Sequence, residues 1–395
     1  VIAAEHNSKS DTGLQVTLIE SPEVNTVGVG EGTWPTMRET LDKIGIDETD
    51  LFRECEASFK QGAKFSKWVT GAEDDFYYHP LVLPQGYTKT DLVFPWQKHR
   101  DDISFADAVS YQGHICEQGR APKLISTPEY AGIANYAYHL NAVKLGCFLQ
   151  KHCIEKLGVQ HIVDHVTAIN STNNGDIASV TTKEHGDIAG DLFIDCSGMS
   201  SIILGEHFKV PFISKKHILF NDTALAVQVP YSDENSPIAS HTISTAQSSG
   251  WIWDIGLPSR RGVGYVYSSK HTNEKEAEVE LRAYIESSIG KAETDKLKVR
   301  KISFNPGHRE KFWHKNCVAI GMASGFLEPL EASALVLVEL AAAKISREMP
   351  ATRETMDIVA KRYNKQFLYR WERIIAFLKL HYVLTQRTDS AYWRD

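Results

Sequence analysis

The sequence contains no apolar run that approaches the roughly 18 residues of a transmembrane helix, so we expect no insertion into a membrane. Its start has no charged stretch followed by an apolar core of the kind that directs secretion. The six cysteines are spread along the chain without a C-x-x-C pair, a pattern typical of reduced thiols in a cytoplasmic protein. These absences favour a cytoplasmic protein.

Metal-binding motifs, repeats and basic clusters are also missing. We find no H-E-x-x-H or EF-hand pattern, and we therefore expect no metal site. A net charge of -7 without a basic stripe argues against nucleic acid as a partner. With 395 residues, 42% of them hydrophobic, the chain has enough apolar material for a large core and two subdomains.

Three glycines occupy alternate positions in the stretch TVGVGEGTWPTM, which begins at residue 26. A phosphate-binding glycine loop belongs about 20 residues before the acidic residue that ends the second strand of a βαβ unit. That acid is Glu20, at the end of the apolar run LQVTLIES. The glycines follow Glu20, so they are not this loop, and a flexible turn is one alternative for them. The opening VIAAEHNSKS resembles the end of a first helix, so we expect the first strand and its phosphate loop to be missing.

Strand and helix patterns alternate along the rest of the chain, which predicts an α/β fold interrupted by a strand-rich insertion. A helix is expected after Pro35, with Thr36 and Glu39 at capping-box spacing. The other expected elements are a strand at 58–68, an aromatic-rich loop at 74–87, a helix at 134–158, strands at 160–183 and 190–198, a strand-rich segment at 220–269, a strand, turn and helix at 315–345, and a long amphipathic helix at 356–385.

Seven sequence blocks, spread over the whole chain, resemble flavin-dependent halogenases of the tryptophan halogenase family. They are VGVGEGTWPTM, ASFKQGAKFSKW, DLFIDCSGM, SGWIWDIGL, GYVYSS, FLEPLEAS and LHYVLTQRTDSAYW. The resemblance implies a discontinuous FAD-binding domain at 1–50, 130–205 and 300–350. It further implies a substrate-side subdomain at 51–129 and 206–299 and a C-terminal helical segment at 351–395.

The same resemblance implies which residues contact the flavin. The glycine stretch matches the loop beside the flavin ring, and two later turns match other flavin contacts. The implied residues are Glu20, Gly28, Gly30, Glu31, Gly32, Thr33, Asp195, Ser197, Gly198 and Gly321.

Lys60 and Glu331 match the catalytic lysine and glutamate of the family. An amine at Lys60 could hydrogen-bond hypohalous acid or form a haloamine, and Glu331 could orient the electrophile or accept the proton that leaves the ring. The alternatives are ordinary ones. Lys60 and Lys64 would share one face of a strand and could simply be solvated, and Glu331 could be placed by the dipole of the following helix.

The halide site implied by the family lies beside this glutamate, at Ser333 and Ala334. The family usually has serine, threonine and glycine where this chain has Ala332, Ser333 and Ala334. Backbone N–H groups survive such changes, and a helix N-terminus still favours an anion. The added Cβ at Ala334 could narrow the pocket.

Three residues match the substrate side of the family's site: His79, Trp251 and Trp253. The two tryptophans are two apart on an expected strand, so both rings face one side, where they could equally be core aromatics. This block departs from the family pattern, because Gly256 replaces the usual proline. A lone histidine such as His79 is commonly structural.

The resemblance implies an enzyme that halogenates an electron-rich, indole-type aromatic with FADH2, O2 and chloride or bromide, by hypohalous acid relayed to Lys60. A separate NAD(P)H-dependent flavin reductase would supply FADH2, and a homodimer is possible. A flavin monooxygenase that hydroxylates its substrate and a non-catalytic relative are the alternatives. The chain ends about where the family's substrate lid begins, so the substrate is left unnamed.

Overall fold

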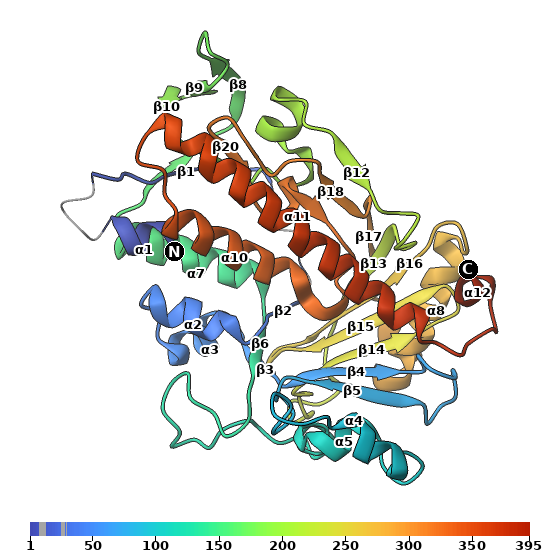
Figure 1. The fold of residues 1–395 in the computed structure, drawn as a ribbon. Helices are drawn as coiled ribbons and strands as arrows, with labels where there is room; N and C mark the ends of the chain where they lie inside the picture. Colours follow the sequence, from blue (N-terminus) through green and yellow to red (C-terminus); the bar gives the residue numbers. More distant parts are fainter. Residues whose placement is uncertain (8–12, 25–27, 29) are drawn as a thin grey trace.

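The computed structural model describes residues 1–7, 13–24, 28 and 30–395 of the chain as a mixed α/β fold (Figure 1). Residues 8–10 of the expected first helix, and Thr26, Val27 and Val29 of the glycine stretch, lie outside the described residues. Among the described residues, no helix combines the length and apolar character that a membrane span requires. All six cysteines are unpaired.

Two short pairs of parallel strands contain the strands that the sequence assigns to the nucleotide-binding part of the fold. The apolar run that ends at Glu20 forms β1 (Thr17–Glu20), which lies parallel to β7 (Gln160–Val163). Likewise β11 (Phe193–Asp195) lies parallel to β20 (Cys317–Ala319), and β19 (Trp313–His314) pairs with β20 on its other edge. Carboxyl ends of parallel strands are where such folds hold ligands.

A three-stranded antiparallel sheet positions the glycine stretch against the lysine strand. Its order is β2 (Glu31–Gly32), β6 (Ala137–Leu140) and β3 (Ser58–Lys60). Helices α2 (Thr36–Lys43), α3 (Glu48–Glu54) and α7 (Ala142–Glu155) pack around it through a shared apolar cluster. The central strand β6 therefore fixes β2 and β3 relative to each other.

A seven-stranded sheet forms the strand-rich part of the chain. Its order is β17 (Arg300–Ser303), β13 (Thr223–Val229), β16 (Arg261–Tyr267), β15 (Gly250–Gly256), β14 (Thr242–Ala246), β4 (Gly62–Ser66) and β5 (Phe76–Pro80). One face packs on helix α8 (Glu274–Ile289), and the other joins the largest apolar cluster of the described residues. Helix α11 (Arg353–Val383), which runs diagonally across the view in Figure 1, contributes much of that cluster.

Short helical segments also occur: η1 (Gln97–His99), η2 (Gly198–Ser200), η3 (Ile202–His207), η4 (Gly321–Ala323) and η5 (Leu330–Ala332). The other α-helices and strands complete the fold, and α10 contributes to the largest apolar cluster. They are the helices α1 (Ile2–His6), α4 (Val93–Trp96), α5 (Phe105–Val109), α6 (Gln112–Glu117), α9 (Lys291–Thr294), α10 (Ser333–Arg347) and α12 (Ala391–Arg394), and the strands β8 (Val166–Ser171), β9 (Ile177–Thr182), β10 (Gly186–Ala189), β12 (Phe212–Ser214), β18 (Gly307–Arg309) and β21 (Gly325–Phe326).

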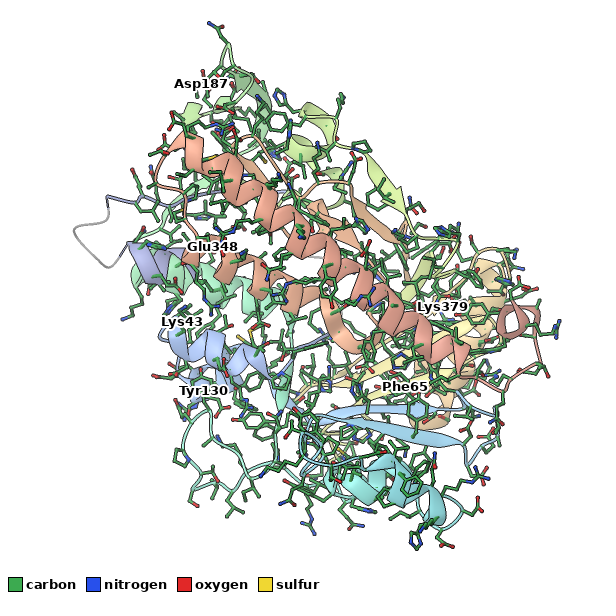
Figure 2. All side chains as sticks on the ribbon, viewed as in Figure 1. Lys43, Phe65, Tyr130, Asp187, Glu348 and Lys379 are labelled. Atoms are coloured by element: carbon green, nitrogen blue, oxygen red, sulfur yellow. The ribbon has the colours of Figure 1, made fainter. Side chains whose placement is uncertain are left out.

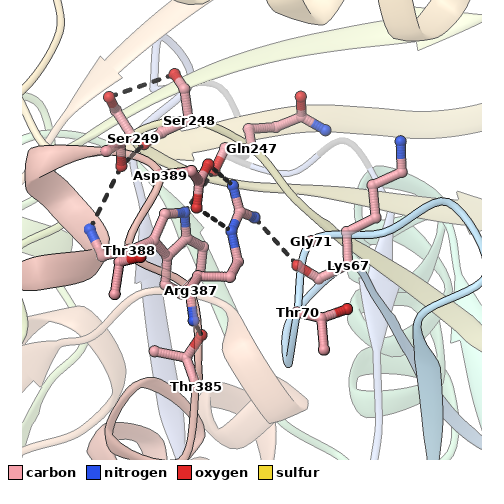
Figure 3. Close-up of polar contacts among 12 residues, drawn as sticks. Lys67, Thr70, Gly71, Gln247, Ser248, Ser249, Thr385, Arg387, Thr388 and Asp389 are labelled. Atoms are coloured by element: carbon pink, nitrogen blue, oxygen red, sulfur yellow. Dashed lines mark hydrogen bonds and ion pairs between the residues drawn. The ribbon is translucent and has the colours of Figure 1, made fainter.

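The segment that follows α11 is fastened to the β4–β5 hairpin (Figure 3). Arg387 donates to the carbonyl oxygen of Lys67 at 3.0 Å. Two further nitrogens of its guanidinium donate to the carboxylate of Asp389. A Cβ on Gly71 would lie 3.3 Å from Arg387 Nε, so the hairpin tip fits closely around the guanidinium. This clamp holds the end of α11 over β4.

Four expectations about local structure are wrong. The expected strand at 58–68 is two strands in different sheets, so Lys60 and Lys64 do not share a face; Lys60 is buried, whereas Lys64 pairs with Glu117 at 2.6 Å. At this change of sheet the chain passes close to β5, because a Cβ on Gly62 would lie 2.6 Å from the carbonyl oxygen of His79.

The other three corrections concern two strands that were expected as a loop and as part of a helix, and one helix cap. Residues 76–80 of the expected aromatic-rich loop form strand β5, because they pair with β4. Residues 137–140 of the expected helix form β6, the central strand of a sheet. The capping box is absent, because the N-cap of α2 is Pro35 and no side chain caps it.

Candidate active site

Lys60 lies at the end of β3 with its amine inside the protein. The side chain is only 3% exposed, and its Nζ donates a hydrogen bond to the carbonyl oxygen of Thr33 at 3.2 Å. Burial lowers the pKa of Lys60 to about 8, and the nearby carboxylate of Glu331 limits that decrease. The Lys60 ammonium therefore releases its proton more readily than that of an exposed lysine.

Gly32 marks the point where three segments converge. A Cβ placed on Gly32 would lie 3.2 Å from the Cβ of Ala332 and 3.3 Å from Nζ of Lys60. The amine of Lys60 and the turn that contains Glu331 thus face each other across a glycine. Gly32 is needed here because any side chain would crowd both.

The turn that carries Glu331 has an unusual backbone. Glu331 and Ala332 both adopt left-handed conformations, with φ of 62° and 54°, immediately before helix α10. Such conformations cost non-glycine residues roughly 1–2 kcal/mol each. The indole of Trp34 donates to the carbonyl oxygen of Glu331 at 2.7 Å and helps to hold the turn. Strain of this kind is typical of a position under functional constraint.

Two histidines hold the carboxylate of Glu331. His79 Nδ1 lies 2.7 Å and His381 Nε2 lies 3.1 Å from the same oxygen, Oε1. Burial would raise the pKa of Glu331, but the hydrogen bonds from His381 and His79 outweigh it and hold the pKa at about 2. Glu331 is therefore ionised at neutral pH.

His381 is a site residue that the sequence reasoning missed. It lies on α11, and its ring packs 4.8 Å from that of Phe65 on β4. Figure 2, where Phe65 and Lys379 are labelled, shows this end of α11 beside β4. The only sequence signal was its place in the block LHYVLTQRTDSAYW. Its partner Glu331 is 50 positions away, beyond the reach of any local pattern.

The tryptophan pair lies as the strand spacing predicts. Trp251 and Trp253 are buried on the same face of β15, with ring centroids 6.4 Å apart, in the cluster that α11 covers. The indole of Trp251 donates to Oε2 of Glu328 at 2.7 Å, and Tyr382 and Asn221 donate to the same oxygen. Trp251 is therefore tied to the segment that leads into the Glu331 turn.

The two residues expected to bind halide open helix α10. Ser333 is buried, whereas Ala334 is exposed. The Cβ that crowds this region belongs to Ala332, which faces Gly32. The expectation that the added Cβ at Ala334 narrows a pocket stays a prediction, and the exposure of Ala334 does not favour it.

The residues expected to contact the flavin lie on the glycine stretch, at the end of β1 and in two later turns. Thr33 and Gly32 lie beside Lys60, whereas the Glu31 carboxyl lies near Gly28, and burial raises its pKa to about 7. A Cβ on Gly28 would lie 2.6 Å from Cβ of Ala142, and one on Gly30 would lie 3.3 Å from Cγ2 of Ile255, so both glycines lie close to neighbouring side chains. Glu20 lies on a different strand, at the carboxyl end of β1, where its half-exposed carboxylate meets His161 and Gln150.

Asp195 organises a turn rather than offering a free carboxylate. Its Oδ1 accepts from the N–H and hydroxyl of Ser197, and its Oδ2 accepts from the N–H groups of Ile203 and Leu204. This arrangement sets Gly198, with φ of 69°, next to the turn of Gly321, with φ of 64°. Both turns follow parallel neighbouring strands.

This arrangement fits a bound flavin. A Cβ on Gly198 would meet only Met322, at 3.9 Å, and one on Gly321 only Val338, at 3.7 Å, so the backbone of both turns is open to a planar ligand. The carboxylate of Glu20 retains acceptor capacity for ribose hydroxyls. The described part of the chain has no group of three His, Cys, Asp or Glu side chains that could hold a metal ion.

Comparisons with known proteins show the family of the whole chain. The model of the family described as tryptophan halogenase matches residues 1–395. The tryptophan 6-halogenase SttH of Streptomyces toxytricini is 33% identical over 403 residues, which cover 97% of this chain and 75% of SttH.

Solved structures extend the match to the fold. A tryptophan halogenase from Shewanella frigidimarina NCIMB 400 is 53% identical, with a TM-score of 0.96 over 100% of this chain and 76% of that one. Tar14, a tryptophan C-6 flavin-dependent halogenase from taromycin biosynthesis, is 31% identical with a TM-score of 0.92, over 100% of this chain and 78% of that one. The mixed α/β fold is thus a halogenase fold, and the chain belongs to the tryptophan halogenase family of flavin-dependent halogenase enzymes.

Proposed function

We propose that this enzyme halogenates an electron-rich, indole-type aromatic substrate with hypohalous acid that is relayed to Lys60. The observation that carries the proposal is the convergence of Lys60 and the Glu331 turn on Gly32. It brings a buried amine, partly neutral near pH 8, close to a carboxylate that stays ionised. These are the two groups that an electrophilic aromatic substitution needs.

Lys60 binds or reacts with the electrophilic halogen. A neutral amine can hydrogen-bond hypohalous acid, or its nitrogen can attack the halogen to form a haloamine while water leaves. Burial favours the neutral amine and excludes competing water. The halogen is then delivered to the ring from a fixed position next to Thr33.

Glu331 takes the proton that the halogenated ring loses. Its carboxylate is ionised, and His79 and His381 hold one oxygen, which leaves Oε2 without a histidine partner. We assign Oε2 to proton transfer. His79 and His381 are then positioning residues, and His79, with a side chain 44% exposed, also faces the substrate side.

FAD would be held by the glycine stretch, Glu20, and the turns of Gly198 and Gly321. Bound reduced flavin, with O2, supplies the oxidising equivalents that convert halide to hypohalous acid. A separate NAD(P)H-dependent reductase would deliver the reduced flavin. Trp251 and Trp253 would keep the aromatic substrate away from the flavin, and the first residues of α10, Ser333 and Ala334, would hold the halide through backbone N–H groups.

The division of the chain follows from these roles. The FAD-binding part would comprise 1–50, 130–205 and 300–350, and the substrate-side part 51–129 and 206–299. The parallel pairs β1–β7 and β11–β20 lie in the first part, and six strands of the seven-stranded sheet arise wholly within the second, in support of this division. Residues 351–395 would form the C-terminal helical segment, which supplies His381.

The proposal is tested by product analysis. The enzyme is supplied with a flavin reductase, NADH, FAD, O2, bromide or chloride and an indole, and the products are separated by mass. We expect halogenated indole that depends on halide. Hydroxylated indole would instead establish a monooxygenase, and the absence of both products with a reference halogenase active in parallel would establish a non-catalytic relative.

A further inference from the structure

Lys60 must release a proton before its nitrogen can attack a halogen, yet its amine is buried. The ammonium group has three N–H donors, and one of them bonds to Thr33. Breaking one N–H bond leaves the electron pair on Nζ and sends a proton out of the interior. A route for that proton is therefore required.

The segment behind Lys60 is unusually polar for a buried region. Directly after Lys60, the backbone N–H of Gln61 donates to the carbonyl oxygen of Ser240 at 2.7 Å, and its side-chain amide donates to Ser240 Oγ at 3.0 Å. His139, on β6, stands opposite Ser58, so its side chain shares a face of the sheet with Lys60. Its Nε2 lies 2.8 Å from Thr242 Oγ1.

Three buried polar atoms in this region have no protein partner among the described residues. They are Oε1 of Gln61, Nδ1 of His139 and Nδ1 of His241. All three side chains are at least nine-tenths buried. They lie together where the backbone of Gln61 bonds to Ser240 and the ring of His139 meets Thr242. Buried polar atoms almost always form hydrogen bonds with protein or with ordered water, so we expect internal water next to these three atoms.

The far end of this region reaches the surface. His241 Nε2 lies 3.5 Å from the hydroxyl of Tyr78, which donates to Oε1 of Glu117 at 2.5 Å. Glu117 also accepts from Lys64 and is 44% exposed. Its carboxylate is in contact with solvent.

We propose that His139, Gln61 and His241, with internal water between them, form a proton path from Lys60 to Tyr78 and Glu117. The proton that leaves Nζ passes along this path to the exposed carboxylate and then to solvent. The path rests on the proposed function for its purpose, but its existence does not depend on halogenation. These residues act through Lys60 and do not touch the substrate.

The charges around Lys60 suit such a path. Glu331 and His79 face the amine from the substrate side, and His139 faces it from β6. Burial lowers the pKa of His139 far below its usual value and that of His241 to about 4. Both imidazoles are therefore neutral near pH 7, so each can accept a proton at one nitrogen and release one from the other without holding a charge next to Lys60.

The experiment follows the hydrogens of Lys60 directly. The protein is labelled with [15N]lysine, the Nζ signal is assigned from its loss in Lys60→Met, and its hydrogen exchange with water is measured near pH 6.5 without flavin or substrate. Tyr78→Phe keeps the ring but removes the hydroxyl, and His139→Phe and His241→Phe remove the imidazoles. We expect exchange to slow at least tenfold in each folded variant.

His308→Phe is the matched control. His308 is also buried, with an unpartnered Nε2, but it packs on Phe312 and Trp371 and has no place in the path. Its replacement should leave the exchange rate of Lys60 unchanged. Unchanged exchange in Tyr78→Phe and His241→Phe, or equal slowing in His308→Phe, would overturn the path. Because no turnover is involved, the path can fail while halogenation holds, and the reverse is equally measurable.

Discussion

Gly32 and Lys60 lie so close that no side chain fits between them, since a Cβ on Gly32 would sit 3.3 Å from Nζ. It would also sit 3.2 Å from the Cβ of Ala332. We therefore expect Gly32→Ala to displace the amine from the Glu331 turn and to lower halogenation at least tenfold. The cost in stability should be about 1–3 kcal/mol, as for other overpacked sites.

Gly146→Ala is the control for this change. Gly146 lies inside α7, where a Cβ would meet nothing within 4 Å. It should raise stability by about 0.5–1 kcal/mol without altering activity. Product formation and thermal unfolding are measured for both variants. Full activity in Gly32→Ala would show that the close approach of Gly32 to Lys60 and Ala332 is not needed for halogenation.

Lys60→Ala should abolish halogenation but leave flavin oxidation intact. Lys60 acts after halide has been oxidised, so hypohalous acid should escape into solution, where a trapping reagent detects it. Lys301→Ala, which removes a half-exposed lysine paired with Glu274, serves as the control and should be fully active. Substantial halogenation by Lys60→Ala would refute the assigned role.

Lys60 should also destabilise the fold at neutral pH. Its pKa is about 8 in the folded state against about 10.4 unfolded, so the unfolded chain binds more protons between these values. The free energy of unfolding therefore rises with pH across that window, by about 3 kcal/mol in total. Lys60→Met should remove this rise and, after loss of the Thr33 hydrogen bond, be about 2 kcal/mol more stable at pH 7. Urea unfolding at pH 7 and pH 10 measures both effects, and equal pH slopes in the two proteins would contradict them.

The sequence predicted features that depend on local periodicity and missed those that depend on distant partners. The alternation that put Trp251 and Trp253 on one face holds because β15 is an uninterrupted strand. The same reasoning failed for Lys60 and Lys64, because the chain changes sheets at Gly62. No local pattern marks that change, because β6 and β14, which pair with Ser58–Lys60 and Gly62–Ser66 respectively, come from distant parts of the chain.

The candidate site shows the same division. Lys60 and Glu331 were found from their sequence blocks, and the structure brings Lys60 and the turn that contains Glu331 to the same glycine. His79 was expected in a loop, but pairing with β4 makes it part of a strand. His381 could not be found, since the amphipathic pattern of α11 shows which face is buried but not which carboxylate that face meets.

His79 and Glu331 should titrate as linked groups. Burial lowers the pKa of His79, but its hydrogen bond to the Glu331 carboxylate more than offsets this and raises the pKa above its usual value. In Glu331→Gln only the lowering effects remain, so the pKa of His79 should fall below 6.5. NMR titration of the His79 ring in both proteins measures the difference. His308, remote from this pair, should titrate alike in both, and an unchanged His79 would contradict the linkage.

The last expectation concerns the choice of halide. This chain has Ala332 and Ala334 where the family usually has serine and glycine, and Ala332 holds a left-handed conformation against Gly32. The backbone donors at the start of α10 remain, but Ala332 lacks the hydroxyl that serine would offer near an anion. Bromide loses its water more easily than chloride, so a site with fewer donors should lose chloride turnover first.

We therefore expect the enzyme to prefer bromide to chloride. Ala332→Ser with Ala334→Gly should raise the use of chloride relative to bromide, and because Ala334 is exposed, Ala334→Gly alone should do little. Competition at equal halide concentrations, with chlorinated and brominated product measured by mass, gives the ratio for each protein. Preferential chlorination by the parent, or an effect confined to Ala334→Gly, would count against a role for Ala332 in halide selection.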